Sequence, residues 1–413
     1  MGATDHTAGS KGRIAWCVSP RLSGVTTVYQ VIGGGLRRAG WDVVAVSVGV
    51  GAAREFDQRF AVESFEILAP DSSDVRRNAA EFIHWVDARQ IDVVFCTGQA
   101  FTLAAAPALP SHVRMITRVA NMTRRGYELA TANLARIDRI VVETPRQQKD
   151  LIRSWAVPPE KCAVIPGGIE VETYSRGTIR DFQGSLRLIY LGRLEENQKA
   201  VLLFPRMARR LAESGVKFHF DLCGEGPDEA RLKAAFGRSK LLDRVTFHGA
   251  LRRPQTLPIL QQAHVLLLTS RFEGVPWALL EGMACGCVPV VSKILGTTDF
   301  VVDHGVNGLL CTVGDAAAFA REIGKLAADR KRLEALSGAA TQTIRERFTV
   351  ERAVRDHEAM LGAVLAQEPS ALAPMPVSEI QAPKILGSGW RRWVPQPVKN
   401  YLRTWAERFH WSV

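Results

Sequence analysis

The sequence has no run of about 18 uninterrupted apolar residues, which a helix needs to cross a bilayer. Its start, Met1 to Lys11, is small and polar, so the charged-then-apolar pattern of a secretory signal is missing. Cysteine is sparse, with seven residues scattered mostly in or beside apolar stretches. We therefore expect a cytoplasmic protein with buried free thiols. Cys285 and Cys287 are too close in sequence, and lack a second pair, to indicate a metal site.

The composition describes a globular protein of more than one domain. Hydrophobic residues make up 46% and charged residues 23% of 413 positions. A single core stops growing at roughly 250 to 300 residues, so this length favours two domains. The net charge of +11 is concentrated toward the end, where residues 384–413 hold six basic residues, one acid and four tryptophans. That tail suggests a surface partner.

Short apolar strands alternate with helical patterns along most of the chain, which predicts parallel sheets. The fold class that we expect is α/β. A first series of strands is predicted at 14–18, 43–48, 93–96, 115–119, 140–142 and 163–165. After a connecting segment, a second series is predicted at 186–191, 218–223, 245–248, 265–268, 288–291 and 309–311. Helical patterns follow at 316–328, 331–347 and 350–365.

The most informative stretch runs from Ser270 to Val291 and carries two glutamates. Glu273 lies in a loop after a strand, and Glu281 lies about five residues into a helix that starts near Pro276 and is closed by Gly286. A helix start offers free N–H groups and a positive dipole to a phosphate, and carboxylates beside it can hold sugar hydroxyls. The pattern indicates a nucleotide-sugar site, although two solvated glutamates on an amphipathic helix would also fit it.

Glu-x7-Glu in this setting resembles the donor-site signature of the retaining glycosyltransferases of family 4. The resemblance covers roughly residues 13–366 and implies a GT-B fold, in which two Rossmann-like domains face a central cleft. It implies an N-terminal acceptor-side domain (1–165), an interdomain linker (166–184), a C-terminal donor-binding domain (185–347) and a helix returning to the first domain (348–366). Beyond the resemblance, four prolines predict a flexible Pro-rich tether (367–383), which is followed by the basic aromatic tail (384–413). The tail would be an amphipathic extension of the fold.

The resemblance also assigns the residues of the donor site. Glu273 would position sugar hydroxyls and Glu281 the ribose, while Arg193 and Lys199, at the end of the first strand of the second domain, would hold the diphosphate. Catalysis would rest on Glu273, Arg193 and Lys199. The remaining donor-binding positions would be Gly24, Gly192, Gly224, Leu251, Gly274 and Val275.

Several positions depart from the family pattern. The usual Gly after the diphosphate lysine is Ala200, and Ser23 replaces a Gly before Gly24. Many relatives place a His near residues 117–121, but none occurs there, so the acceptor-side polar group stays open between Arg118 and Asn121. A histidine from elsewhere could also serve; the candidates are His84, His112 and His304.

No Asp-x-Asp occurs in the chain, the pair that metal-dependent glycosyltransferases commonly use to bridge a metal and a diphosphate. We therefore expect no metal and no cofactor, with Arg193, Lys199 and helix amides neutralising the leaving group. The predicted reaction is transfer from a nucleotide diphosphate sugar, UDP-linked on family grounds, to a hydroxyl of a glycan or lipid-linked acceptor. Attack on the same face would retain the anomeric configuration.

The tail predicts a peripheral membrane contact. Val398, Trp405 and Phe409 recur at helical spacing, and basic residues lie largely elsewhere around that helix. Such a segment suits an anionic lipid surface, although it could equally dock on the protein's own body. We expect no nucleic-acid partner.

Two other functions remain open. A non-catalytic nucleotide-sugar-binding or scaffold protein would keep the donor residues without an acceptor side, and the missing His fits this reading. A two-domain epimerase or phosphorylase matches the Glu-x7-Glu setting less well.

Overall fold

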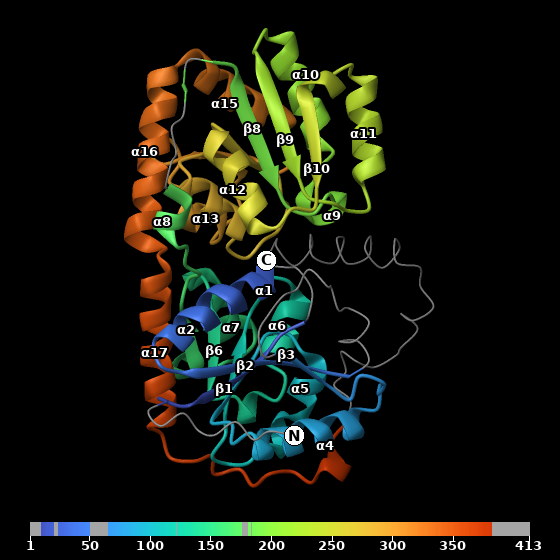
Figure 1. The fold of residues 1–413 in the computed structure, drawn as a ribbon, viewed down its shortest axis with the longest axis vertical. Helices are drawn as coiled ribbons and strands as arrows, with labels where there is room; N and C mark the ends of the chain where they lie inside the picture. The colour runs from blue at the N-terminus through green and yellow to red at the C-terminus, as the bar shows by residue number, and fades with distance from the viewer. Residues whose placement is uncertain are drawn as a thin grey trace. The chain divides into compact units, whose positions relative to one another are not determined.

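The computed structural model describes residues 10–19, 24–49, 65–120, 122–175, 181–182 and 184–381 (Figure 1). These residues form two compact domains. The first comprises the residues up to Gly168 together with those from Val350 onward, and the second comprises Ile169–Thr349. The chain crosses from the first domain to the second between Gly168 and Ile169, and it returns between Thr349 and Val350. These crossings fall within the predicted linker (166–184) and the predicted returning helix (348–366).

The first domain is built on a parallel sheet with the strand order β3-β2-β1-β4-β5-β6-β7. Its strands are β1 (Arg13–Cys17), β2 (Asp42–Val48), β3 (Phe65–Leu68), β4 (Val93–Cys96), β5 (Arg114–Arg118), β6 (Arg139–Val142) and β7 (Cys162–Val164). The sequence analysis missed β3, an edge strand of four half-buried residues whose pattern is too short to stand out. The other strands lie within one or two residues of their predicted positions.

Helices of the first domain cover this sheet, as the alternating pattern requires. They are α1 (Gly24–Val28), η1 (Tyr29–Gly33, a π-helical turn), α2 (Gly34–Arg38), α4 (Val75–Ala88), α5 (Ala100–Ala105), η2 (Ala106–Ala108), α6 (Arg124–Ala130), η3 (Leu134–Arg136), α7 (Pro145–Ser154), η4 (Pro159–Lys161), α17 (Val350–Leu365) and η6 (Val377–Glu379). Helix α17 packs closely on α2, because a Cβ at Gly35 would lie 2.3 Å from Val354. Glu358 of α17 also pairs with Lys11 at 2.7 Å.

The second domain has a parallel sheet in the order β10-β9-β8-β11-β12-β13. Its strands are β8 (Leu186–Leu191), β9 (Phe218–Cys223), β10 (Val245–Gly249), β11 (Val265–Leu268), β12 (Val288–Ser292) and β13 (Leu309–Cys311). Its helices are α8 (Val171–Ser175), α9 (Glu196–Lys199), α10 (Leu203–Glu213), α11 (Glu229–Arg238), η5 (Leu242–Arg244), α12 (Arg253–Gln262), α13 (Trp277–Ala284), α14 (Thr298–Val301), α15 (Ala316–Ala328) and α16 (Arg330–Arg347). The predicted α/β class is therefore confirmed in both domains.

The strand order of the second domain reverses between β8 and β11. Strands β8, β9 and β10 run outward on one side, while β11, β12 and β13 run outward on the other. In open α/β sheets, ligands bind beyond the carboxyl ends of the strands where the order reverses. The loops after β8 and β11, which carry Lys199 and Glu273, meet at that point.

The Pro-rich segment after α17 lies along the first domain, which differs from the flexible tether expected from its prolines. Ser370 N donates to Ser111 O at 3.0 Å, and Met375 N donates to Pro107 O at 2.9 Å. Farther along, Ile380 is 3% exposed in the core of the first domain. Anchored backbone amides and a buried side chain hold the chain, so prolines here produce an extended strap. We call residues 367–381 the C-terminal strap.

Candidate active site

Backbone contacts join the two loops at the reversal of the second sheet. Arg271 N donates to Gln198 O at 2.8 Å, and Thr269 Oγ1 donates to Lys199 O at 2.8 Å. The Arg271 guanidinium adds an ion pair with Glu196 at 2.6 Å. The loop after β8 and the loop after β11 are therefore fastened to each other, and we call the two together the loop floor. The predicted catalytic residues lie on it.

Lys199 and Glu273 are direct partners on this floor. The Lys199 Nζ lies 2.5 Å from Glu273 Oε1, and Ser270 Oγ donates to the same oxygen at 2.6 Å. Gln198 Nε2 reaches the other oxygen at 3.4 Å. The Glu273 side chain is 8% exposed and Lys199 is 20% exposed. A carboxylate desolvated to this degree needs such partners, so the pair is orientated before any ligand arrives.

Ala200 ends the short helix that carries Lys199. The four-residue helix α9 ends there, with Ala200 in the left-handed conformation at φ 51° and fully buried. This conformation costs a non-glycine residue roughly 1 kcal/mol or more, which is why Gly suits the position. The departure from the family pattern therefore keeps the backbone path that a glycine would take.

Arg193 differs from Lys199 because its side chain is 66% exposed. Its Nη2 contacts Glu195 at 3.1 Å, and Glu195 is 7% exposed. The guanidinium thus lies at the surface beside the floor, anchored on one side and open on the other. A fork of N–H donors held in this way suits a phosphate group.

Glu281 lies inside α13 and is 6% exposed. Two side chains that the sequence analysis did not single out hold its carboxylate: Tyr174 donates to Oε1 at 3.0 Å and Arg253 Nε at 2.9 Å. Tyr174 comes from α8 and Arg253 from α12, and neither lies in a motif that the sequence analysis recognised.

Helix α13 begins at Trp277, so Pro276 is the N-cap instead of the expected first helical residue. Gly286 follows the C-terminus with φ 78°, as a C-cap glycine does.

The glycines of the two turns after β8 and β9 allow backbone to pack on backbone. Gly224 has φ 143°, and a Cβ there would lie 1.9 Å from Gly192 O. A Cβ at Gly226 would lie 2.3 Å from Leu194 O. A Cβ at Gly192, whose φ is 155°, would lie 2.9 Å from the Tyr190 hydroxyl oxygen. Gly192 and Gly224, predicted to bind the donor, therefore have a structural reason to be glycine whether or not a ligand touches them.

The remaining donor candidates take varied positions. Gly274 and Val275 are buried between Glu273 and the start of α13, with Val275 4% exposed. Leu251 is half-buried after β10 and packs against the core of the second domain. Gly24 opens α1 in the first domain and is exposed.

On the first domain, the acceptor-side candidate Arg118 is buried and ion-paired. It lies at the carboxyl end of β5, is 6% exposed, and its Nη2 donates to Glu143 Oε1 at the end of β6. Glu143 is a polar residue that the sequence analysis missed, since it follows an ordinary apolar strand. Asn121, the other candidate, lies outside the described residues.

His357 of α17 is affected by the charge of Arg118, and it was not among the histidines considered from the sequence. Its ring lies 6.0 Å from that of Phe95, and it is 3% exposed. Nδ1 donates to Ala353 O at 2.7 Å, and in the described part of the chain Nε2 has no hydrogen-bond partner. Burial, together with the positive charge of Arg118, lowers the pKa of His357 to about 4. His84, His112 and His304 do not join this cluster.

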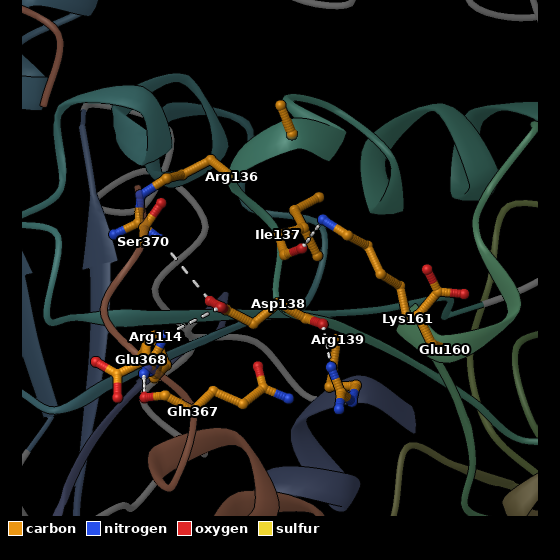
Figure 2. A pocket seen from close by; sticks show the side chains of 11 residues that line it. Arg114, Arg136, Ile137, Asp138, Arg139, Glu160, Lys161, Gln367, Glu368 and Ser370 are labelled. Atoms are coloured by element: carbon orange, nitrogen blue, oxygen red, sulfur yellow. Dashed lines mark hydrogen bonds and ion pairs between the residues drawn. The ribbon is translucent and has the colours of Figure 1, made fainter. Parts of the chain in front are cut away.

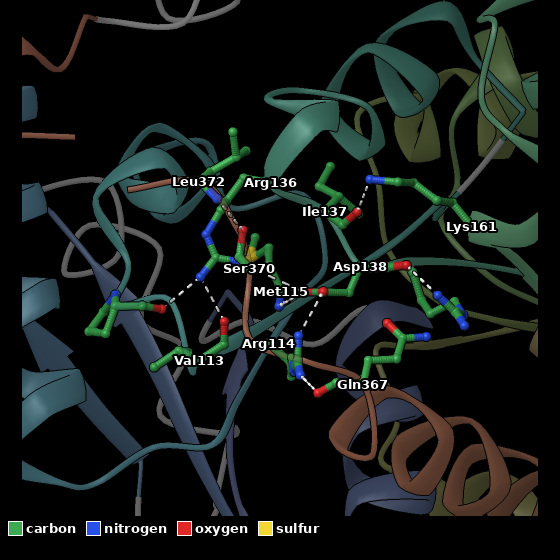
Figure 3. A network of polar contacts seen from close by, with 12 residues as sticks. Val113, Arg114, Met115, Arg136, Ile137, Asp138, Lys161, Gln367, Ser370 and Leu372 are labelled. Carbon is green, nitrogen blue, oxygen red and sulfur yellow. Dashed lines mark hydrogen bonds and ion pairs between the residues drawn. The ribbon is translucent and has the colours of Figure 1, made fainter. Parts of the chain in front are cut away.

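A separate polar network lies at the opposite end of the first sheet (Figures 2 and 3). It surrounds a hollow of about 360 Å³ at the starts of β5, β6 and β7, walled partly by the C-terminal strap. Asp138 lies between Arg114 at 3.5 Å and Arg136 at 3.8 Å, and accepts from Met115 N at 2.7 Å.

The basic side chains of this network already donate hydrogen bonds to backbone carbonyl groups of the protein. Arg114 Nη2 donates to Gln367 O of the strap, Arg136 Nη2 donates to Val113 O at 2.7 Å, and Lys161 Nζ donates to Ile137 O at 2.5 Å (Figure 3). Burial, reinforced by neighbouring Arg114, lowers the pKa of Arg136. We therefore interpret the network as a fastening of the strap to the domain.

The described residues contain no helix long and apolar enough to span a bilayer. In the same residues, no three His, Cys, Asp or Glu side chains converge as they would around a metal ion. All seven cysteines are free thiols, and Cys162 is the half-buried one.

Two family models match the chain, one in each domain. Residues 22–173 match the model described as Glycosyltransferase Family 4, and residues 185–329 match Glycosyl transferases group 1. Among curated relatives, the putative colanic acid biosynthesis glycosyltransferase WcaL of Salmonella typhimurium is 28% identical over 52% of this chain and 54% of its own length. The amylovoran biosynthesis glycosyltransferase AmsK of Erwinia amylovora is 33% identical over 40% of this chain and 41% of its own length. The chain spans about half the length of these curated relatives or less.

Solved structures with the same architecture cover most of the chain. A glycosyltransferase from Rickettsia africae aligns with a TM-score of 0.71 at 15% identity, over 87% of this chain and all of its own. HepE from Anabaena, in complex with UDP and glucose, aligns with a TM-score of 0.70 at 16% identity, over 85% of this chain and all of its own. Two parallel α/β domains of this kind define the GT-B fold. Within that fold class, the chain belongs to the glycosyltransferases of family 4.

Proposed function

We propose that this protein transfers a sugar from a nucleotide diphosphate sugar to a hydroxyl of a glycan or lipid-linked acceptor, with retention of the anomeric configuration. The observation that carries the proposal is the Lys199–Glu273 pair on the loop floor where the second sheet reverses. UDP is the nucleotide that we propose, since HepE, which shares the fold, was solved with UDP.

The donor would lie across the loops after β8 and β11. Arg193, exposed at the surface, and the N–H groups at the start of α13 supply positive charge for the diphosphate. Glu273 would accept from hydroxyls of the transferred sugar, and Glu281 from those of the ribose. Gly192, Gly224, Leu251, Gly274 and Val275 would line this path.

Cleavage of the donor bond builds negative charge on the leaving diphosphate and positive charge on the anomeric carbon. Groups fixed before the reaction stabilise such charge most effectively, and removal of a single donor costs about 3 to 4 kcal/mol in other enzymes. Arg193 and Lys199 would meet the diphosphate charge, and Glu273 lies beside Lys199 at 2.5 Å. We propose that the acceptor hydroxyl attacks the same face and that the departing phosphate takes its proton.

We also propose that catalysis needs no metal and no cofactor. The charge on the diphosphate would be met by Arg193, Lys199 and helix amides, and the sequence has no Asp-x-Asp. A chelator such as EDTA should leave turnover unchanged. Loss of turnover that added Mg²⁺ or Mn²⁺ restores would overturn this part.

On the acceptor side, we propose that the Arg118–Glu143 pair takes the place of the absent histidine. The pair lies at the carboxyl ends of β5 and β6, where open α/β sheets bind ligands. Glu143→Gln should then raise the KM for the acceptor while leaving that for the donor unchanged. An equal effect on both substrates would remove Arg118 and Glu143 from the acceptor side.

The decisive experiment incubates the protein with a panel of nucleotide sugars and measures nucleotide release. Glu273→Ala should abolish release, and Glu229→Ala should not. Glu229 is a matched control because it also pairs with a lysine, Lys233 at 2.7 Å, in the same domain but outside the site. Nucleotide binding without release by the unaltered protein would favour the non-catalytic alternative. Equal release by both glutamate variants would reject the role of Glu273.

We propose that the basic aromatic tail attaches the enzyme to an anionic membrane, where a lipid-linked acceptor lies. This segment lies beyond the described residues. The support is compositional: six basic residues and four tryptophans in residues 384–413. Deletion of these residues should abolish co-flotation with liposomes containing anionic lipid. Unchanged flotation would reject the membrane role.

A further inference from the structure

The carboxylate of Glu281 is held on one oxygen by two side chains from different elements. Tyr174 of α8 donates to Oε1 at 3.0 Å, and Arg253 at the start of α12 donates to the same atom at 2.9 Å. In the described part of the chain, the contacts assigned to this carboxylate all fall on Oε1. The other oxygen, Oε2, is therefore the one left for a ligand.

Arg253 is itself fixed by aromatic rings. Its guanidinium lies 5.8 Å from the centre of the Tyr174 ring and 5.7 Å from that of Trp277, the first residue of α13. Burial acts to lower the pKa of Arg253, but Glu281 and Tyr174 outweigh it and the pKa is raised. Burial and the Glu281 charge raise the pKa of Tyr174. Arg253 therefore remains a cation and Tyr174 a proton donor.

This arrangement orientates Glu281 in a way that its own helix could not. A glutamate side chain rotates about three bonds, and a carboxylate free to turn would present either oxygen. Two donors on Oε1, one of them a guanidinium that also contacts the Tyr174 and Trp277 rings, select one orientation before binding. Preorganisation of this kind increases affinity because the ligand does not have to order the side chain.

We propose that Tyr174 and Arg253 are positioning residues that aim Glu281 Oε2 at the ribose hydroxyls of the donor and so make the site selective for ribonucleotides. The proposal rests on the proposed function, in which Glu281 meets the ribose. It adds the residues that set the selectivity. A site built to accept hydrogen bonds from hydroxyls discriminates strongly against an analogue that lacks one, because a buried acceptor is left unpaired.

The test measures binding of UDP and of 2′-deoxy-UDP to the full-length protein by calorimetry, which does not depend on turnover. GDP and ADP, each with its 2′-deoxy counterpart, are included so that the base need not be known. The unaltered protein should prefer the ribonucleotide by roughly tenfold or more, as expected for one hydrogen bond to a charged group. Tyr174→Phe and Arg253→Gln should each weaken ribonucleotide binding about fivefold and leave deoxyribonucleotide binding nearly unchanged. The preference should therefore fall.

Two matched controls separate this role from packing. Tyr127→Phe removes a buried tyrosine hydroxyl that donates to Asp150 at 2.9 Å in the first domain. Arg347→Gln removes a guanidinium that lies over the rings of Phe300 and Phe348 at 5.5 and 5.1 Å. Both should leave the preference for ribonucleotides intact, even where they lower the melting temperature.

The outcomes also separate this inference from the proposed function. If no nucleoside diphosphate binds, both fall. If the unaltered protein binds ribo and deoxyribo forms equally, the ribose role of Glu281 is wrong while a transferase activity measured by nucleotide release would still stand. If the preference persists unchanged in Tyr174→Phe and Arg253→Gln, the two residues only pack, and the inference is overturned.

Discussion

Glu273 and Lys199 lie 2.5 Å apart although 74 residues separate them in the sequence. They belong to neighbouring loops whose backbones are hydrogen-bonded together, so the pair acts as one unit. We expect Glu273→Gln and Lys199→Met each to lower kcat/KM about 100-fold, and the double variant to lower it little further. Transferase kinetics on the four proteins, with melting curves to check folding, measure this. Multiplicative losses in the double variant would mean that the two residues act independently.

Gly224→Ala should destabilise the second domain by about 2 kcal/mol or more. A Cβ at this position would meet Gly192 O at 1.9 Å, and φ is 143°, so the backbone itself has to move. Chemical denaturation gives the free energy of unfolding. Gly237→Ala is the control, since it lies in α11 with its nearest neighbour at 3.5 Å, and it should stabilise by roughly 0.5 to 1 kcal/mol. Similar effects at both glycines would argue against the packing of the two turns.

The first domain should lose stability as the pH falls below about 6.5. The pKa of His357 is about 4 when folded and roughly 6.5 in an unfolded chain. Between these values the unfolded chain binds a proton that the folded domain does not, so unfolding becomes easier. From pH 7 to pH 5 this amounts to about 2 kcal/mol. Denaturation curves of His357→Leu at both pH values should show a pH dependence smaller by that amount, with exposed His84→Leu as the control. An unchanged pH dependence in His357→Leu would mean that His357 is already protonated or solvated.

Asp138→Asn should destabilise the first domain by about 3 kcal/mol, because it leaves Arg114 and Arg136 buried beside a neutral group. The strap should then be cleaved faster in limited proteolysis, since Arg114 holds Gln367. Asp150→Asn is the matched control: its carboxylate accepts from Tyr127 and Arg146 but is 22% exposed, and it should cost less. Equal losses of stability and equal rates of strap cleavage in Asp138→Asn and Asp150→Asn would mean that the network does not fasten the strap.

The sequence predicted the parts of the structure that repeat or that carry a motif. Alternating apolar strands gave both sheets, and the long helices were placed to within about a residue; helix α15, for example, spans 316–328 as expected. The Glu-x7-Glu segment placed Glu273 in a loop and Glu281 five residues into a helix, as the structure has them. These features depend on local periodicity and turn chemistry, which a single sequence carries.

The features that the sequence did not predict depend on contacts between distant segments. Tyr174, Arg253 and Glu143 lie in stretches without a motif and acquire their roles through partners 25 to 107 residues away. The ring of His357 lies beside that of Phe95, which is distant in the sequence. The strap was expected to be a flexible tether because prolines break helices, while burial of Ile380 cannot be read from local composition. Prolines exclude a helix without excluding an ordered, extended path.

The two chain crossings between the domains lie next to each other. Ile169 N donates to Phe348 O at 2.8 Å, and Ile169 forms a bridge with Thr349. In topological terms, residues 169–349 are an insertion into a first domain made of two segments, and the insertion begins and ends at adjacent points. A segment whose two ends lie close together is readily inserted into another chain, because the host chain needs only a small gap to accept it. Arg193, Lys199, Tyr174, Arg253, Glu273 and Glu281 all lie within this insertion. If they bind the donor as proposed, we expect the donor site to be transferable as one unit, so that a different host domain would change the choice of acceptor.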